Sequence, residues 1–90
     1  MTSDKYFDKY FKLKDAYPDQ IVMMRNGVFY DILGDDALAV SRMLDKRVSA
    51  MSDGKRSLHA VTIPYHELHR ATGALAASGY GVIVEEPDNE

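Results

Sequence analysis

Three histidines carry the side chains of this sequence that most readily bind metals or transfer protons. His66 and His69 lie three residues apart, with Glu67 between them, and His59 precedes them. This spacing is not the His-Glu-x-x-His pattern of zinc enzymes, and no further ligand follows at a recognisable distance. The sequence also lacks cysteine, a glycine-rich phosphate loop and a nucleophile–base pair. We therefore expect no metal site, no catalytic residue, no cofactor and no small-molecule substrate, so the chain is not predicted to be an enzyme.

A second group of candidate residues lies in two strand-like runs on either side of Asn26-Gly27. Asn-Gly is the preferred pair for a two-residue type I′ turn, because both residues tolerate positive φ. Residues 20–33 are therefore predicted to form a β-hairpin whose loop fixes the register. The expected cross-strand pairs are Arg25 with Val28, Met24 with Phe29, Met23 with Tyr30 and Val22 with Asp31.

The two faces of this hairpin differ in character. One face is uniformly apolar and is the better candidate for the core. On the other face, Phe29 and Asp31 project side by side, because residues at i and i+2 of a strand point the same way. Phe29 is either a packed strand residue or an exposed ring, and Asp31 is either solvated or a hydrogen-bonding group. The apolar face carries Ile21, Met23, Val28, Tyr30 and Ile32.

Three basic residues are candidates for phosphate contacts. Arg25 flanks the hairpin turn, and Lys55 and Arg56 lie in a second turn predicted after Ser52. Such side chains either neutralise phosphates or only keep a loop tip solvated. Both interpretations remain open for each of the three residues.

The elements that must position these residues alternate along the chain in the order α-β-β-α-β-β-α-β. This order predicts an α/β (α+β) fold with two layers, in which a mixed sheet of about five strands packs against three helices. We expect one domain over residues 1–90, with Ser3 as the first N-cap. The predicted elements are a helix at 3–17, the hairpin at 20–33, a helix at 35–45, strands at 47–51 and 58–63, a helix at 65–78, a strand at 80–85 and an acidic tail at 86–90.

Composition limits the function classes further. The formal net charge is −3 over 90 residues, which argues against strong, independent binding of nucleic acid, because a basic surface supplies most of that affinity. No apolar run approaches the roughly 20 residues needed to cross a membrane, and the N-terminus does not resemble a signal peptide. We therefore expect a cytoplasmic protein with no membrane partner.

Five segments together resemble a known family, and one of them is Asp36-Ala37 followed by Ala39, Leu44 and Asp45 in the second predicted helix. The hairpin segment Asn26-Gly27-Val28-Phe29-Tyr30-Asp31 is similar to the Gly-Asp-Phe-Tyr-Glu segment of the MutS DNA mismatch-repair family. The resemblance extends, in the same order and spacing, over nearly the whole chain, so the chain resembles the N-terminal mismatch-recognition domain of MutS. The other matching segments are Leu13 to Asp19, Ile63-Pro64-Tyr65-His66, and Gly79-Tyr80 followed by Val82-Ile83-Val84-Glu85.

The resemblance implies a role for each candidate residue. In the family the phenylalanine stacks into the duplex at a mismatch and the glutamate hydrogen-bonds the mismatched base. It therefore implies that Phe29 is a wedge and Asp31 a base contact, with phosphates reached by Arg25, Lys55 and Arg56. Aspartate is one methylene shorter than glutamate, so Asp31 reaches roughly 1.3 Å less far. The family's aspartate before the phenylalanine is Val28 here, and the glutamine that ends its last segment is Glu86.

We expect a stand-alone domain that weakly binds or probes mismatched or distorted duplex DNA. ATP binding would belong only to the full-length family, whose clamp, lever and ATPase domains do not fit in 90 residues. One alternative is a protein-interaction module that has kept the fold, lost DNA binding and docks on a repair or mobile-element protein. Another is a gene fragment without a selected function.

Overall fold

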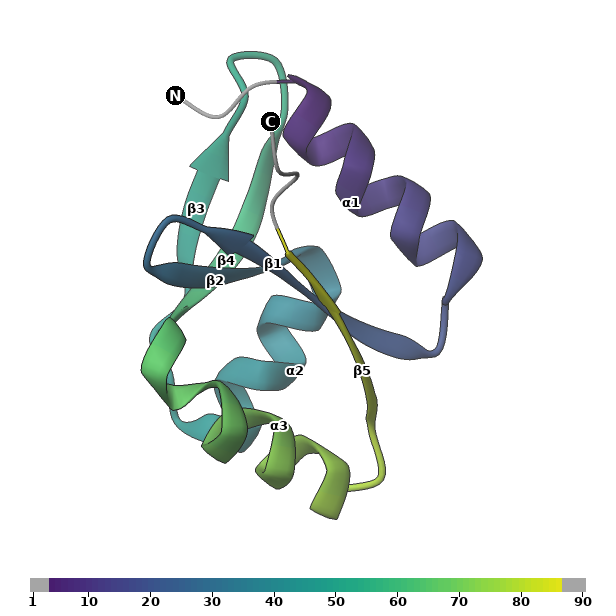
Figure 1. Cartoon of the computed structure of the whole chain (residues 1–90). Helices are drawn as coiled ribbons and strands as arrows, with labels where there is room; N and C mark the ends of the chain where they lie inside the picture. Colours follow the sequence, from purple (N-terminus) through teal and green to yellow (C-terminus); the bar gives the residue numbers. More distant parts are fainter. Residues whose placement is uncertain (1–3, 87–90) are drawn as a thin grey trace.

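The computed structural model describes residues 4–86, which form a five-stranded sheet and three α-helices in the order expected from the sequence. Ser3, the expected first N-cap, and residues 87–90 of the expected acidic tail lie outside the described residues. The elements are α1 (Asp4–Ala16), β1 (Gln20–Asn26), β2 (Phe29–Leu33), α2 (Gly34–Leu44), β3 (Ser49–Ser52), β4 (Ser57–Pro64), the 3₁₀ turn η1 (Tyr65–Glu67), α3 (Leu68–Ala77) and β5 (Gly81–Glu85) (Figure 1).

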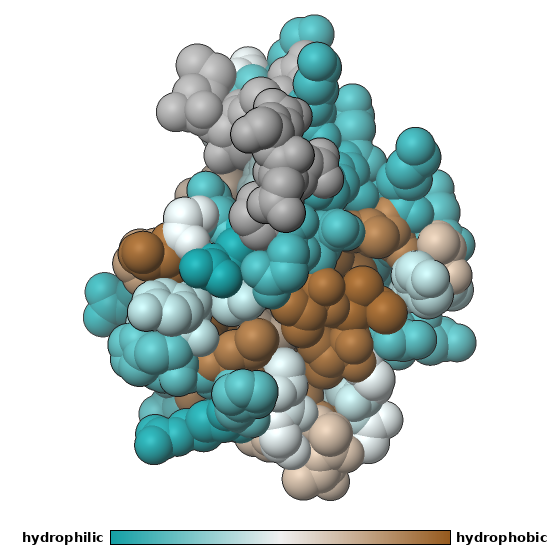
Figure 2. Space-filling model, in the orientation of Figure 1, coloured by the Kyte–Doolittle hydropathy of each residue, from teal (hydrophilic) through white to brown (hydrophobic). Residues whose placement is uncertain are grey.

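The sheet is mixed, as predicted, with the strand order β3-β4-β2-β1-β5. β5 runs parallel to β1, and the other three neighbouring pairs are antiparallel. This arrangement confirms the α+β fold class and places the β1–β2 hairpin in the middle of the sheet. β5 forms one edge, where Val84 is 36% exposed, and Figure 2 shows hydrophobic surface gathered over this strand.

Helices cover both faces of the sheet, which adds a layer to the expected two. The apolar hairpin face predicted for the core does pack on α2 and α3, while α1 covers the opposite face (Figure 1). Both faces of the hairpin are buried, and this explains why both carry mostly apolar side chains. The α2–α3 side includes Ile21, Met23, Tyr30, Ile32, Val40, Val61, Ile63 and Leu75. The α1 side includes Phe7, Tyr10, Val22, Met24, Leu33 and Ala60.

The expected register of the hairpin is wrong by two residues. Asn26 pairs with Phe29, and Met24 pairs with Asp31 instead of with Phe29. The loop is Gly27-Val28, and of its two residues only Gly27 has positive φ, at 64°. That pattern is typical of a type II′ turn, which needs glycine at its first position, whereas type I′ needs positive φ at both. Since side chains alternate with a period of two, the shift leaves the strand residues on their predicted faces. Val28 is the exception: it was expected on the core face, but it lies in the loop and is 59% exposed.

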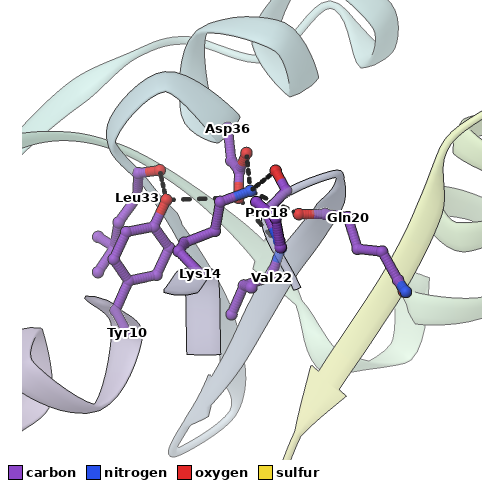
Figure 3. Close-up of polar contacts among 7 residues, drawn as sticks. All are labelled: Tyr10, Lys14, Pro18, Gln20, Val22, Leu33 and Asp36. Carbon is purple, nitrogen blue, oxygen red and sulfur yellow. Dashed lines mark hydrogen bonds and ion pairs between the residues drawn. The ribbon is translucent and has the colours of Figure 1, made fainter. Parts of the chain in front are cut away.

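A polar network fastens the C-terminal half of α1 to the start of β1 and α2 (Figure 3). Lys14 Nζ donates to the carbonyl of Gln20 at 2.6 Å and forms an ion pair with Asp36 at 3.1 Å. The Tyr10 hydroxyl donates to the Leu33 carbonyl at 2.8 Å. Burial, and then the nearby Asp36 carboxylate, raise the pKa of Tyr10. Because most of these groups are shielded from water, the network fixes how α1 lies across the hairpin.

Two helix ends have local causes. α1 ends two residues before Pro18, because the residue preceding a proline is disfavoured in the helical region. The helix expected over 65–78 begins instead as the 3₁₀ turn η1 directly after Pro64, and α-helical geometry starts at Leu68. Such turns are common at helix N-termini. None of the helices described between residues 4 and 86 is long and apolar enough to cross a membrane.

Candidate functional site

The tip of the β1–β2 hairpin is held from both sides. The Arg25 Nε atom donates to the Gly27 carbonyl at 2.7 Å, and the Tyr65 backbone N–H donates to the Val28 carbonyl at 2.8 Å. The second bond joins the hairpin tip to the start of η1, which follows the strand paired with β2. The two carbonyl groups of the loop are therefore held by hydrogen bonds, and the residues at its ends are paired in the sheet. The backbone that carries the exposed side chains is thus fixed in position.

An apolar surface is exposed at this tip. Val28 is 59% exposed, Phe29 44% and Tyr65 50%. Phe29 is the first residue of β2 and pairs with Pro64, so its ring lies at the end of the sheet where η1 begins. Of the two interpretations that the sequence left open for Phe29, the exposed ring is the one observed. An exposed aromatic ring on a rigid turn has the form needed to insert between stacked bases.

Asp31 is buried, at 2% exposure, although it lies on the same face of the strand as Phe29. Its Oδ2 atom accepts a hydrogen bond of 2.6 Å from the Tyr6 hydroxyl and one of 2.9 Å from the Asn26 side-chain amide. Burial and these contacts with Asp31 raise the pKa of Tyr6. The expectation that Asp31 projects beside Phe29 is therefore corrected: α1 covers Asp31, and the carboxylate joins α1 to the hairpin.

Arg25 lies between two aromatic rings. Its guanidinium carbon is 5.5 Å from the centre of the Tyr30 ring and 5.1 Å from that of Tyr65, distances typical of cation–π contacts. Its Nη1 atom forms an ion pair with Glu86 at 3.3 Å, and Tyr30 donates to the same carboxylate at 2.7 Å. Burial, and then the hydrogen bond to Glu86, raise the pKa of Tyr30. Arg25 pairs with Tyr30 across the hairpin, so its side chain lies near the tip on the face of the sheet opposite to Phe29.

The turn that contains Lys55 and Arg56 is organised around a buried carboxylate. Asp53 accepts hydrogen bonds from the backbone N–H groups of Arg56 at 2.7 Å and Lys55 at 2.9 Å. The bond from Arg56 has the larger effect and the bond from Lys55 the next. Together they lower the pKa of Asp53 from its ordinary 3.8 to about 2. The Arg56 guanidinium also pairs with Asp53 at 2.9 Å and with Asp8 of α1 at 3.1 Å. Arg56 therefore joins this turn to α1, while Lys55 is exposed.

The structure places two of the five predicted residues at the same end of the hairpin, with their side chains on opposite faces of the sheet. Arg25 and Phe29 share the hairpin tip, where β4 ends at Pro64. Lys55 and Arg56 precede the first residue of β4, so the length of that strand, roughly 20 Å, separates them from the tip. Figure 1 shows the two turns at different corners of the molecule. The candidate site is therefore the hairpin tip.

Sequence reasoning missed the partners of these residues. Tyr6 lies 25 residues from Asp31, and Glu86 lies 61 residues from Arg25. No local pattern marks either contact, because each depends on which elements become neighbours. The only local signal was Glu86 itself, a carboxylate where the resembled family has glutamine. Among residues 4–86, no group of three His, Asp or Glu side chains is placed to hold a metal ion.

Comparison with known proteins gives a consistent set of matches. The family model of MutS domain I matches residues 5–90. The DNA mismatch repair protein MutS of Myxococcus xanthus is 33% identical over 85 residues, which cover 90% of this chain and 10% of that protein. MutS of Fervidobacterium nodosum is 36% identical over 78 residues, covering 87% and 9%. MutS of Trichormus variabilis is 31% identical over 81 residues, covering 89% and 10%. The chain spans about a tenth of the length of these curated relatives.

Proposed function

Because this chain belongs to the MutS domain I family, we propose that it binds duplex DNA and probes it for mismatched or distorted base steps with the tip of the β1–β2 hairpin. The observation that carries the proposal is the 44% exposure of Phe29 on a turn held by hydrogen bonds. An aromatic wedge partly unstacks a base step, and a mismatched step costs less to unstack. The preference for distorted DNA then arises partly from the lower cost of unstacking the DNA and partly from the shape of the protein.

Each candidate residue takes a role that its contacts allow. Phe29 is the wedge, and Arg25, at the same end of the hairpin on the opposite face, contacts a backbone phosphate. Lys55 is a second, distant phosphate contact. Arg56 and Asp31 act as positioning residues: their charged groups are engaged with Asp8, Asp53, Tyr6 and Asn26.

The proposed binding is weak and consists of recognition alone, in the cytoplasm, with no ATP hydrolysis by this domain. A net charge of −3 and so few phosphate contacts support an affinity in or above the non-specific range of about 10⁻⁴ to 10⁻⁶ M. Removing the base contact from Asp31 also removes the reading of a particular mismatched base. Discrimination would then depend on how easily a step unstacks.

The test is a titration with a homoduplex, a G·T mismatch and a one-base bulge at low salt, using wild type, Phe29→Ala and Tyr17→Ala. Tyr17 is a suitable control because it is 43% exposed and precedes β1, at the end of that strand far from the turn. Loss of base–aromatic stacking should reduce bulge binding by Phe29→Ala about tenfold. Tyr17→Ala should bind as wild type does.

The outcomes separate the proposal from its competitors. Wild-type preference for the bulge that disappears only in Phe29→Ala supports probing. Absence of binding to all three duplexes would exclude the proposal. Equal loss in both variants would show that any exposed ring contributes and that the hairpin tip is not the site.

A protein-interaction module is the second candidate. The apolar tip formed by Val28, Phe29 and Tyr65 on an acidic chain favours it, because exposed aromatic residues are enriched at protein interfaces. The partner would be a repair or mobile-element protein. In that case Phe29→Ala would reduce capture of the partner while none of the duplexes binds.

A further inference from the structure

The charged group of Arg25 already has an anion beside it. Glu86 Oε1 lies 3.3 Å from Arg25 Nη1, and Glu86 Oε2 accepts a 2.7 Å hydrogen bond from Tyr30. The Tyr30 and Tyr65 rings lie near the guanidinium. Together, the Arg25 guanidinium and the Tyr30 hydroxyl form a small receptor for an anion at the hairpin tip, and the carboxylate of Glu86 occupies it.

The carboxylate is the more exposed and less constrained partner in this pair. The side chain of Glu86 is 54% exposed, against 28% for Arg25. Arg25 is also held through Nε by the Gly27 carbonyl and by its cation–π contacts, none of which involves Glu86. If Glu86 swung away, Arg25 would keep its place with one edge of its guanidinium open to another acceptor.

A backbone phosphate has the chemistry to replace this carboxylate. Both groups present anionic oxygens to a guanidinium, whose planar donors bind carboxylates and phosphates alike. Resting on the function proposed above, we propose that Glu86 occupies an anion site on Arg25 and Tyr30 that takes a DNA backbone phosphate. Duplex binding at the tip then requires displacement of Glu86, which makes this residue an internal competitor.

Glu86→Gln should therefore increase affinity for duplex DNA. The amide oxygen still accepts the hydrogen bond from Tyr30, while the charge that pairs with Arg25 is gone. Releasing an exposed ion pair of this kind should tighten bulge binding by up to about fivefold, which corresponds to the upper value of about 1 kcal/mol for such pairs. Glu85→Gln is the matched control, because it changes the net charge equally and Glu85 is the preceding residue, in β5.

The increase must depend on Arg25. In an Arg25→Ala background, Glu86→Gln and Glu85→Gln should change duplex affinity equally, since only the general loss of negative charge remains. A second measurement needs no DNA: inorganic phosphate is titrated while the Nε–Hε resonance of Arg25 is followed by NMR. Glu86→Gln should respond at a several-fold lower phosphate concentration than wild type or Glu85→Gln.

The two measurements distinguish failure of this inference from failure of the proposed function. An Arg25 response to phosphate that Glu86→Gln enhances, without duplex binding by any variant, would support the anion site and exclude the DNA function. Duplex binding by wild type with equal effects of Glu86→Gln and Glu85→Gln would overturn the anion site and leave the function standing. The site is also overturned if Glu86→Gln changes neither measurement.

Discussion

Asp31 and Phe29 lie two residues apart on the same face of β2, yet only Phe29 is exposed. The difference comes from their contacts: Tyr6 of α1 lies against Asp31, whereas the Phe29 ring is 44% exposed. Tyr6 and Asn26 both donate to Asp31, and a carboxylate that accepts two hydrogen bonds in a buried place is stabilised where it lies. At the residue scale, Asp31 therefore fixes the hairpin against α1 and leaves Phe29 as the group that faces outward.

Replacing Tyr6 by phenylalanine tests this assignment. The Tyr6→Phe variant keeps the ring but removes a donor to a buried carboxylate, which should lower the free energy of unfolding by about 1 to 2 kcal/mol. The measurement is urea unfolding followed by circular dichroism. Tyr17→Phe, the same change at an exposed site, should alter stability little; equal effects of the two variants would contradict the role given to Asp31.

The hairpin is the element on which the candidate site depends. Its loop needs Gly27, with φ at 64°, because a residue with a side chain is strained in that region. Nothing lies within 4 Å of the position that a Cβ atom of residue 27 would take. Any cost of a substitution there is therefore conformational and not steric.

Gly27→Ala should destabilise the protein by about 1 kcal/mol and weaken duplex binding at the tip. Gly73→Ala is the contrasting variant: Gly73 lies within α3, also with open space around it and without positive φ. Because alanine favours helices, that change should stabilise the protein by about 0.5 to 1 kcal/mol. Thermal unfolding of both variants checks the signs, and a stabilising Gly27→Ala would contradict the assigned turn.

Long-range charge contacts tie the two ends of the described chain to its middle. Arg56 connects the β3–β4 turn to Asp8 in α1, and Glu86 connects the end of β5 to Arg25 in β1. The Asp53 side chain, fully enclosed, organises the first of these contacts. At the scale of the whole molecule, protonation of Asp53 at low pH should therefore weaken the attachment of α1 to the sheet.

The pH dependence of stability follows from Asp53. Its pKa is lowered in the folded protein to about 2 from an ordinary 3.8, so its contribution is fully present above about pH 4 and is lost as pH falls toward 2. Asp53→Asn should unfold more readily at neutral pH and lose less additional stability between pH 4 and 2. The measurement is the urea midpoint of unfolding across that pH range, with Asp19→Asn as an exposed control. If Asp53→Asn lost as much stability as wild type below pH 4, the role given to Asp53 would be contradicted.

Local sequence patterns were enough to predict the element order, the mixed sheet and the face on which each strand residue of the hairpin lies. These features follow from local rules: alternation with a period of two places Ile21 and Tyr30 on one face, and Pro18 limits the first helix. The family resemblance was likewise readable from short segments such as Ile63-Pro64-Tyr65-His66, because their order along the chain is itself sequence information.

Which candidate residues are exposed and which are held by hydrogen bonds or ion pairs depends on how the elements pack together. Phe29 and Asp31 have equivalent positions in the strand pattern, yet Phe29 is exposed while Asp31 is buried and contacted by Tyr6 of α1 and by Asn26. Likewise, Arg25 meets Glu86 only because β5 pairs in parallel with β1. Burial and ion pairing depend on neighbours many residues away, and those neighbours are set by packing of the whole sheet, which no local pattern encodes.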